Sequence, residues 1–73
     1  MATQIIMDHT GDSRHEFNPK DAAALLEAEQ RFNALMRDGY TAAVRSPTGD
    51  ANVTRKFDPN AEETLFVPRF VGG

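Results

Sequence analysis

A single helical pattern, with strand-like segments on both sides of it, is the feature that most constrains the fold of this chain. Asn18 can cap the free backbone N–H groups at the start of a helix, and Pro19 suits the first helical position. Asp21 would face the positive end of the helix dipole. One apolar stripe follows at helical spacing: Leu25, Ala28, Phe32, Leu35 and Met36. The sequence therefore predicts one amphipathic helix that ends near Asp38, with Gly39 as its stop.

The segment ahead of this helix has the pattern of a β-hairpin. Residues 3–9 contain a short apolar run and lead into a polar turn with a glycine at residues 10–12. Residues 13–17 form the second arm, in which only Phe17 is strongly apolar. We expect two strands joined by this tight turn.

Three further strands are expected after the helix, at residues 40–45, 52–57 and 64–67. The Ser-Pro-Thr-Gly-Asp segment at 46–50 has the composition of a turn and is expected to join the first two of them. The acidic segment at 61–63 is expected to form a single helical turn before the last strand. Pro68 lacks a backbone N–H, so it belongs at a strand end or an edge. The predicted order is β-β-α-β-β-β.

We expect one small hydrophobic core, because a domain of 73 residues buries only about 60% of the surface that its unfolded chain exposes. The apolar stripe of the helix, with Phe32 in it, is the face predicted to pack on the sheet. Its expected counterparts on the strands are Phe57, Leu65 and Val67.

The composition restricts the chemistry that the chain can support. The sequence contains no cysteine, which excludes disulfides, thiolate metal ligands and a cysteine nucleophile. The formal net charge of -3 at pH 7 argues against a nucleic-acid-binding surface, which is normally basic. No apolar run reaches the roughly 18 residues of a membrane span, and no export signal is recognisable. We therefore expect a cytoplasmic protein that binds neither nucleic acid nor membrane.

Polar residues around the hairpin turn could bind a metal. His9 and His15 flank the turn, with Asp8 and Asp12 nearby, so imidazole and carboxylate groups could converge there. Their spacing matches no standard zinc pattern, and polar residues beside a turn usually face water. We expect no metal site at this turn.

Acidic and basic residues elsewhere in the chain are further candidates for chemistry or binding. Glu62 and Glu63, with Asp58 before them, could form an acid/base pair, but such a pair needs a concave and partly dry site. A domain of this size seldom encloses one, so we expect these carboxylates to be solvated. A set of basic residues could gather on one sheet face: Arg14, Arg45, Arg55 and Lys56. Without interleaved exposed aromatic residues they form a poor nucleic-acid platform.

The hairpin turn, the approach to the helix and the last two residues form an informative combination. The hairpin turns on Thr10-Gly11, and the second strand runs into Glu-Phe-Asn-Pro at 16–19. One long helix and further strands follow, and the sequence closes on Gly72-Gly73. In this combination the chain resembles the ubiquitin-like β-grasp family.

The resemblance implies an α+β fold of the β-grasp (ubiquitin-like) class, in which a mixed sheet packs on one helix. It implies a single domain at residues 1–67 and a flexible C-terminal tail at residues 68–73. Leu-Phe-Val-Pro at 65–68, followed by Arg-Phe-Val-Gly-Gly, is similar to the tails of bacterial sulfur carriers. The tail of ubiquitin is more basic than this one, which holds only Arg69.

The resemblance further implies a protein that is a substrate of enzymes and is not an enzyme itself. An E1-like activating enzyme would adenylate the carboxylate of Gly73, and Gly72 would let the tail fit a narrow channel. Arg69, Phe70 and Val71 would bind the partner, with no catalytic side chain and no cofactor in this chain. The product would be a thiocarboxylate for a sulfur-accepting enzyme or an isopeptide bond to a lysine of a target protein.

Two alternatives stay open at this point. The chain could be a non-conjugating β-grasp module that binds a larger protein through a sheet face or an edge strand. The Gly72-Gly73 pair could also be a processing remnant with no chemical role. The sequence does not choose between sulfur transfer and conjugation.

Overall fold

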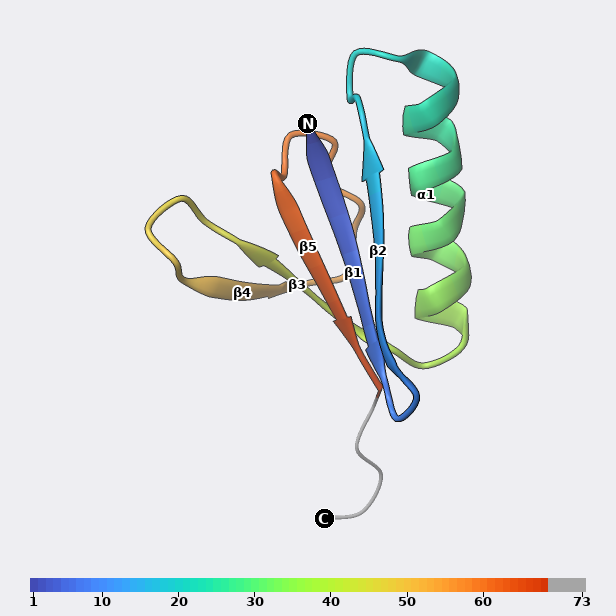
Figure 1. The fold of residues 1–73 in the computed structure, drawn as a ribbon, viewed down its shortest axis with the longest axis vertical. Helices are drawn as coiled ribbons and strands as arrows, with labels where there is room; N and C mark the ends of the chain where they lie inside the picture. Colours follow the sequence, from blue (N-terminus) through green and yellow to red (C-terminus); the bar gives the residue numbers. More distant parts are fainter. Residues whose placement is uncertain (69–73) are drawn as a thin grey trace.

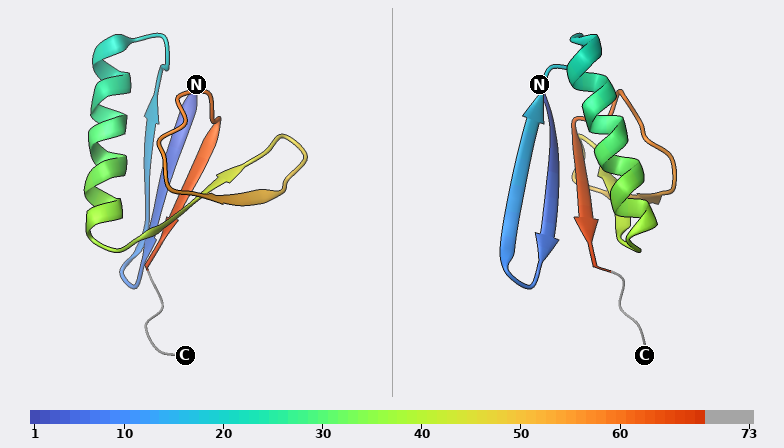
Figure 2. Two further views of the ribbon diagram at one scale, coloured as in Figure 1. Left: turned by 180° about the vertical axis from the view of Figure 1, so that it is seen from behind. Right: turned by 90° about the vertical axis from the view of Figure 1, so that its right-hand side faces the viewer.

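Among the residues that the structure describes, five strands form one mixed sheet, and a single helix lies against one of its faces (Figures 1 and 2). The computed structural model describes residues 1–68. The elements are β1 (Ala2–Asp8), β2 (Gly11–Phe17), α1 (Ala22–Arg37), β3 (Thr41–Arg45), β4 (Ala51–Thr54) and β5 (Glu63–Val67). The strand order is β2-β1-β5-β3-β4, in which β1 and β5 are parallel and the other neighbours antiparallel. This arrangement confirms the α+β class and the predicted order of elements.

The helix begins later than predicted, because Asp21 and not Asn18 is its N-cap. The Asp21 side chain accepts hydrogen bonds from the backbone N–H groups of Ala23 (3.0 Å) and Ala24 (3.3 Å). Its backbone is extended, with φ -87° and ψ 111°, as an N-cap requires. The carboxylate therefore satisfies two of the N–H groups that a helix start leaves free.

Asn18 closes a separate turn ahead of the helix. Its side-chain oxygen accepts a hydrogen bond from Lys20 N (3.0 Å), and its carbonyl accepts one from Asp21 N (2.9 Å). Pro19 lies inside this turn and outside α1. The prediction that Asn18 caps the helix and that Pro19 is its first residue was wrong. Asn18 and Asp21 both have side chains that can cap a helix, but the Asn18 side chain bonds within the preceding turn and Asp21 caps α1.

Replacement of Asp21 by alanine is expected to lower the free energy of unfolding by about 1 kcal/mol, since it removes the cap. Asn18→Ala should cost only a few tenths of a kcal/mol, because its side chain organises an exposed turn. Urea unfolding of both variants checks this ranking. Asp21→Asn, which keeps a capping oxygen, is the matched control and should retain most of the stability. A larger loss in Asn18→Ala than in Asp21→Ala would contradict the assignment.

Glycines end the helix and shape one turn, as predicted. Gly39 has a φ of +91°, and its N–H donates to Met36 O (3.1 Å). Gly49 has a φ of +93° in the β3–β4 turn, where Ser46 N–H donates to Asp50 O (2.7 Å). Both conformations lie in the region that favours glycine.

The helical turn predicted at residues 61–63 does not form. Asn60 N–H donates to the Asp58 side chain (2.9 Å), and Ala61 N–H donates to Asp58 O (3.2 Å), which makes an ordinary turn. Glu63 is already the first residue of β5. The acidic segment is therefore divided between a turn and a strand. Its composition alone did not reveal this division.

Two clusters of buried residues fill the space between the helix and the sheet. The first cluster consists of Ala2, Phe17 and Ala28. The second consists of Phe32, Ala42 and Phe66. The Phe32 ring meets Phe66 edge to face with 5.6 Å between ring centroids, and Phe57 likewise at 5.9 Å. Phe57 packs against both clusters, so it joins them into one core, as the sequence predicted for this residue.

The last strand presents the opposite face from the one predicted. Phe66 and Thr64 are buried on the helix side, whereas Leu65 and Val67 are only half-buried on the other side of the sheet. Successive strand residues alternate between faces, so an error of one position exchanges the whole set. Residues 65–67 are all apolar, so their pattern does not indicate which alternate positions face the helix.

A buried polar contact ties β1 to the helix. Gln4 is 1% exposed, and its side-chain N–H donates to the backbone oxygen of Ala28 (3.0 Å). Arg31 Nη1 in turn donates to the Gln4 side-chain oxygen (2.8 Å). Both polar atoms of the buried amide are thereby satisfied, which removes the penalty for burying it.

Candidate functional site

The residues to which the tail hypothesis assigns chemistry and partner binding lie outside the described residues: Arg69, Phe70, Val71, Gly72 and Gly73. The structure does describe the strand that leads into them. β5 is the central strand of the sheet, paired with β1 on one side and β3 on the other. Pro68 follows directly after β5, at the strand end where it was predicted. The segment at 69–73 therefore follows the central strand of the sheet, which is paired on both sides.

The face of the sheet opposite the helix, here called the outer face, carries a row of apolar residues. The register pairs Ile5 of β1 with Leu65 of β5, Leu65 with Ala43 of β3, and Ala43 with Val53 of β4. Ile5 is 4% exposed, whereas Val53 is 72% exposed at the edge of the sheet. This outer row spans four strands, and its residues range from buried Ile5 through half-buried Leu65 and Ala43 to exposed Val53.

Charged residues border the outer row. Arg14 of β2 stands beside Ile5 in the register. Arg45 and Glu63, which are neighbours on β3 and β5, form an ion pair with 3.2 Å between Nη1 and Oε1. The row therefore has a polar rim, an arrangement common in protein-binding surfaces.

A shallow apolar depression lies at the end of β5. Its cavity of about 490 Å³ is lined by Met7, Asp8, His9, Val67 and Pro68. It thus stands beside the point where the chain passes into the segment at 69–73. An apolar side chain of a partner could bind there.

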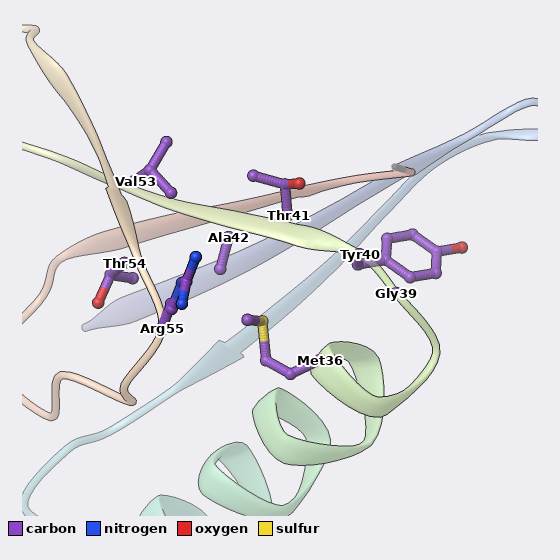
Figure 3. A pocket seen from close by; sticks show the side chains of 8 residues that line it. All are labelled: Met36, Gly39, Tyr40, Thr41, Ala42, Val53, Thr54 and Arg55. Atoms are coloured by element: carbon purple, nitrogen blue, oxygen red, sulfur yellow. The ribbon is translucent and has the colours of Figure 1, made fainter. Parts of the chain in front are cut away.

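A second depression, of about 380 Å³, lies between the end of α1 and the β3–β4 hairpin (Figure 3). Figure 3 shows the side chains of Met36 and Arg55 extending into the space below Ala42, whereas the Tyr40 ring points away from it. Arg55 is the one charged residue among those that line it. The depression is open and contains no pair of groups suited to acid/base or nucleophilic chemistry.

The hairpin turn does not assemble a metal site. His15 pairs with Gln4 on the helix side of the sheet, whereas Asp12 pairs with Met7 on the outer face. Within residues 1–68, no group of three or more metal-ligating side chains could hold an ion. Strand alternation separates residues that looked close in sequence.

Asp8 has a structural role in the same turn. Its carboxylate accepts hydrogen bonds from the Thr10 hydroxyl (2.5 Å) and from Thr10 N–H (2.8 Å). The hydroxyl hydrogen bond, followed by the backbone one, lowers the pKa of Asp8 from its ordinary value of 3.8. The resulting stabilisation is fully present above that value and is lost as the pH falls through the lowered pKa.

The remaining candidate residues are dispersed. Glu63 is paired with Arg45, the Asp58 carboxylate accepts from Asn60 N–H, and Glu62 is exposed, so the three acidic residues form no acid/base pair. The four basic residues do not share one face either. Two lie on outer-face positions of β2 and β3, and the other two follow the end of β4.

No helix among residues 1–68 combines the length and the apolar character that crossing a membrane requires. Comparison of the chain with known proteins gave no relative: no family model, no curated protein and no solved structure matches it.

Proposed function

We propose that the chain is a ubiquitin-like protein modifier or sulfur carrier of the β-grasp type, acted on by an E1-like enzyme in the cytoplasm. The observation that carries the proposal is the combination of the fold with the sequence that follows it. One helix lies across a mixed sheet, β5 is central and parallel to β1, and a Pro-Arg-Phe-Val-Gly-Gly segment follows β5 directly. The side-chain chemistry supports a substrate role, because the described residues form no catalytic group.

The proposed chemistry takes place at the carboxylate of Gly73. The carboxylate attacks the α-phosphate of ATP and releases pyrophosphate, which gives an acyl adenylate. A hydrosulfide equivalent then displaces AMP and leaves a thiocarboxylate. Alternatively, an enzyme cysteine displaces AMP to form a thioester, and a target lysine displaces that cysteine to form an isopeptide bond. In both routes the protein supplies the acyl group and the enzyme supplies the catalytic groups.

Residues near the segment at 69–73 have expected roles in enzyme recognition. Gly72 would permit a narrow approach to the adenylation site, because it has no Cβ. Arg69 would pair with acidic groups, and Phe70 and Val71 would enter apolar subsites. The depression lined by Val67 and its neighbours offers a further apolar contact beside this segment.

Intact mass spectrometry of the protein purified from its native cells tests the proposal. A thiocarboxylate at Gly73 adds about 16 Da, because sulfur replaces oxygen. Conjugation instead gives an adduct with the mass of a second protein, and digestion leaves a branched peptide at the modified lysine. A protein that carries unprocessed residues after Gly73, with neither product present, would exclude the proposal.

A second candidate function is a non-conjugating module that binds a larger protein. The outer row favours it, because apolar residues on four strands surrounded by charged groups match the composition of a binding surface. Such a module would keep its partner when Gly72 and Gly73 are deleted. It would lose the partner in Leu65→Glu, provided that circular dichroism shows an intact fold for that variant.

A further inference from the structure

The two edge strands of the sheet differ in how they are protected. β2 carries charged side chains along its length, at Asp12, Arg14 and Glu16. β4, at the other edge, has the sequence Ala-Asn-Val-Thr and contains neither a charge nor a proline. Charged residues and prolines are the usual means of preventing an edge from pairing with another strand. The sheet therefore has one protected edge and one open edge.

The open edge is also accessible. The first three residues of β4 are exposed, and Val53 is 72% exposed, the most of any large apolar residue except Met1 within residues 1–68. In Figures 1 and 2 the β3–β4 hairpin projects from the side of the sheet away from α1. Neither core cluster among the described residues includes a residue of β4. Another strand could reach this edge without moving the core.

The backbone of β4 is oriented for pairing through Val53. Ser46 N–H donates to Asp50 O, so Asp50 points its carbonyl toward β3. Along an antiparallel strand, the backbone N–H and C=O groups of successive residues point alternately toward the partner strand and away from it. Ala51 and Val53 therefore direct their N–H and C=O groups to the open side of the strand.

Opposite charges stand at the two ends of β4 and are held in place locally. Asp50 precedes the strand, and its N–H donates to Ser46 Oγ (3.2 Å). Lys56 follows the strand, and its N–H donates to Thr54 Oγ1 (3.3 Å) while its carbonyl accepts from that hydroxyl (3.0 Å). Both charged residues are exposed. The edge thus has an acidic end and a basic end, which is the pattern that an antiparallel copy of itself would complement.

We propose that a second copy of this chain pairs with β4, antiparallel and related by a two-fold axis. A two-fold axis that relates two identical edge strands as antiparallel neighbours is perpendicular to the sheet. A residue of one copy therefore pairs only with a residue of the other copy that lies on the same face of the sheet. Two registers centred within the strand follow from this: one places Val53 opposite Val53 of the second copy, and the other places Asn52 opposite Asn52. The register centred on Val53 aligns Asp50 of each copy with Lys56 of the other. The register centred on Asn52 leaves these charges unmatched, so the first is favoured.

The proposed dimer joins two sheets into one and keeps both helices on the same face. The strand of four residues buries much less than the roughly 800 Å² per partner of a standard interface. We therefore expect weak association, with a dissociation constant on the order of 100 µM. β5 is separated from β4 by β3 in the strand order, so the proposal is independent of the modifier or carrier function proposed above.

Sedimentation velocity of the full chain, from about 10 µM to about 1 mM, tests the proposal. We expect the unmodified protein to shift from monomer to dimer across this range. Val53→Lys places two ammonium groups opposite each other at the axis and should remove the dimer. Leu26→Lys is the matched control, because Leu26 is also an exposed apolar residue (54% exposed) but lies on α1. It should leave association unchanged.

Substitutions of the two charged residues at the ends of β4 give the decisive comparison. Asp50→Lys or Lys56→Asp alone is expected to raise the dissociation constant about tenfold, because each creates two like-charge contacts. The double variant restores opposite charges across the interface and should restore association. A monomer at every concentration overturns the proposal, and so does a dimer that none of these substitutions affects. Monomer combined with binding of an unrelated extended peptide at β4 overturns it as well.

Discussion

Deletion of Gly72 and Gly73 is expected to abolish every covalent product of the protein while leaving its fold intact. Under the proposed function the acyl group of Gly73 is the only reacting group that the chain supplies, so its removal leaves nothing to activate. The deletion removes no residue of α1 or of the five strands, which end at Val67. The unfolding midpoint should therefore be unchanged.

An extract of the native cells supplied with ATP is the appropriate assay, because the activating enzyme is unidentified. N-terminally tagged protein should yield a thiocarboxylate or a conjugate, detected by mass spectrometry, and the deletion variant should yield neither. Arg69→Ala is a graded control: it keeps the diglycine and should reduce the yield without eliminating it. Equal product from the full chain and the deletion variant would refute the carrier proposal. Retained binding of an unmodified partner would then favour the interaction module.

Replacement of Phe32 by alanine is expected to lower the free energy of unfolding by about 3 to 5 kcal/mol. Phe32 is 1% exposed, and its ring packs edge to face against both Phe57 and Phe66. The substitution removes the apolar contacts and leaves a cavity where the helix meets the sheet. A domain of this size has a total stability of only about 4 to 11 kcal/mol, so the substitution removes a large share of it and, at the lower end of this range, nearly all of it.

Urea or thermal unfolding followed by circular dichroism measures this effect. Phe32→Leu keeps most of the apolar volume and should cost roughly 1.5 kcal/mol, which provides a measurable folded reference. Leu26→Ala, at an exposed position on the same helix, should be within about 0.5 kcal/mol of the unmodified protein. An unchanged midpoint in Phe32→Ala would contradict the described core.

The sequence predicted the order of elements well because each signal was local. Helical spacing of apolar residues, Gly39 after the helix and a glycine turn at Gly49 each depend on a few neighbouring residues. Interactions over a longer range were not predictable in the same way. The contact of Gln4 with Ala28 and Arg31 joins residues more than 20 positions apart, and nothing in a single sequence indicates that this glutamine is buried.

The candidate surfaces depend on the register of the sheet, and the sequence predicted them only in part. The diglycine segment is visible in the sequence itself. The outer row becomes visible only when Leu65 is placed on the face away from the helix, which required the pairing of β5 with both neighbours. Val53 was expected within a strand that extends to Phe57, but β4 ends at Thr54. Its place on an exposed edge follows from the shorter strand and the strand order.

The parallel pairing of β1 with β5 has a consequence for biosynthesis. The paired residues of the two strands are 60 positions apart in sequence, so the centre of the sheet can close only after residues 63–67 have left the ribosome. Until then a nascent chain contains the β1–β2 hairpin, α1 and the β3–β4 hairpin, but it lacks β5, which joins the two hairpins, and the core residue Phe66. Premature termination ahead of Phe66 should therefore yield fragments that cellular proteases remove, and the domain should fold only after translation has passed this point.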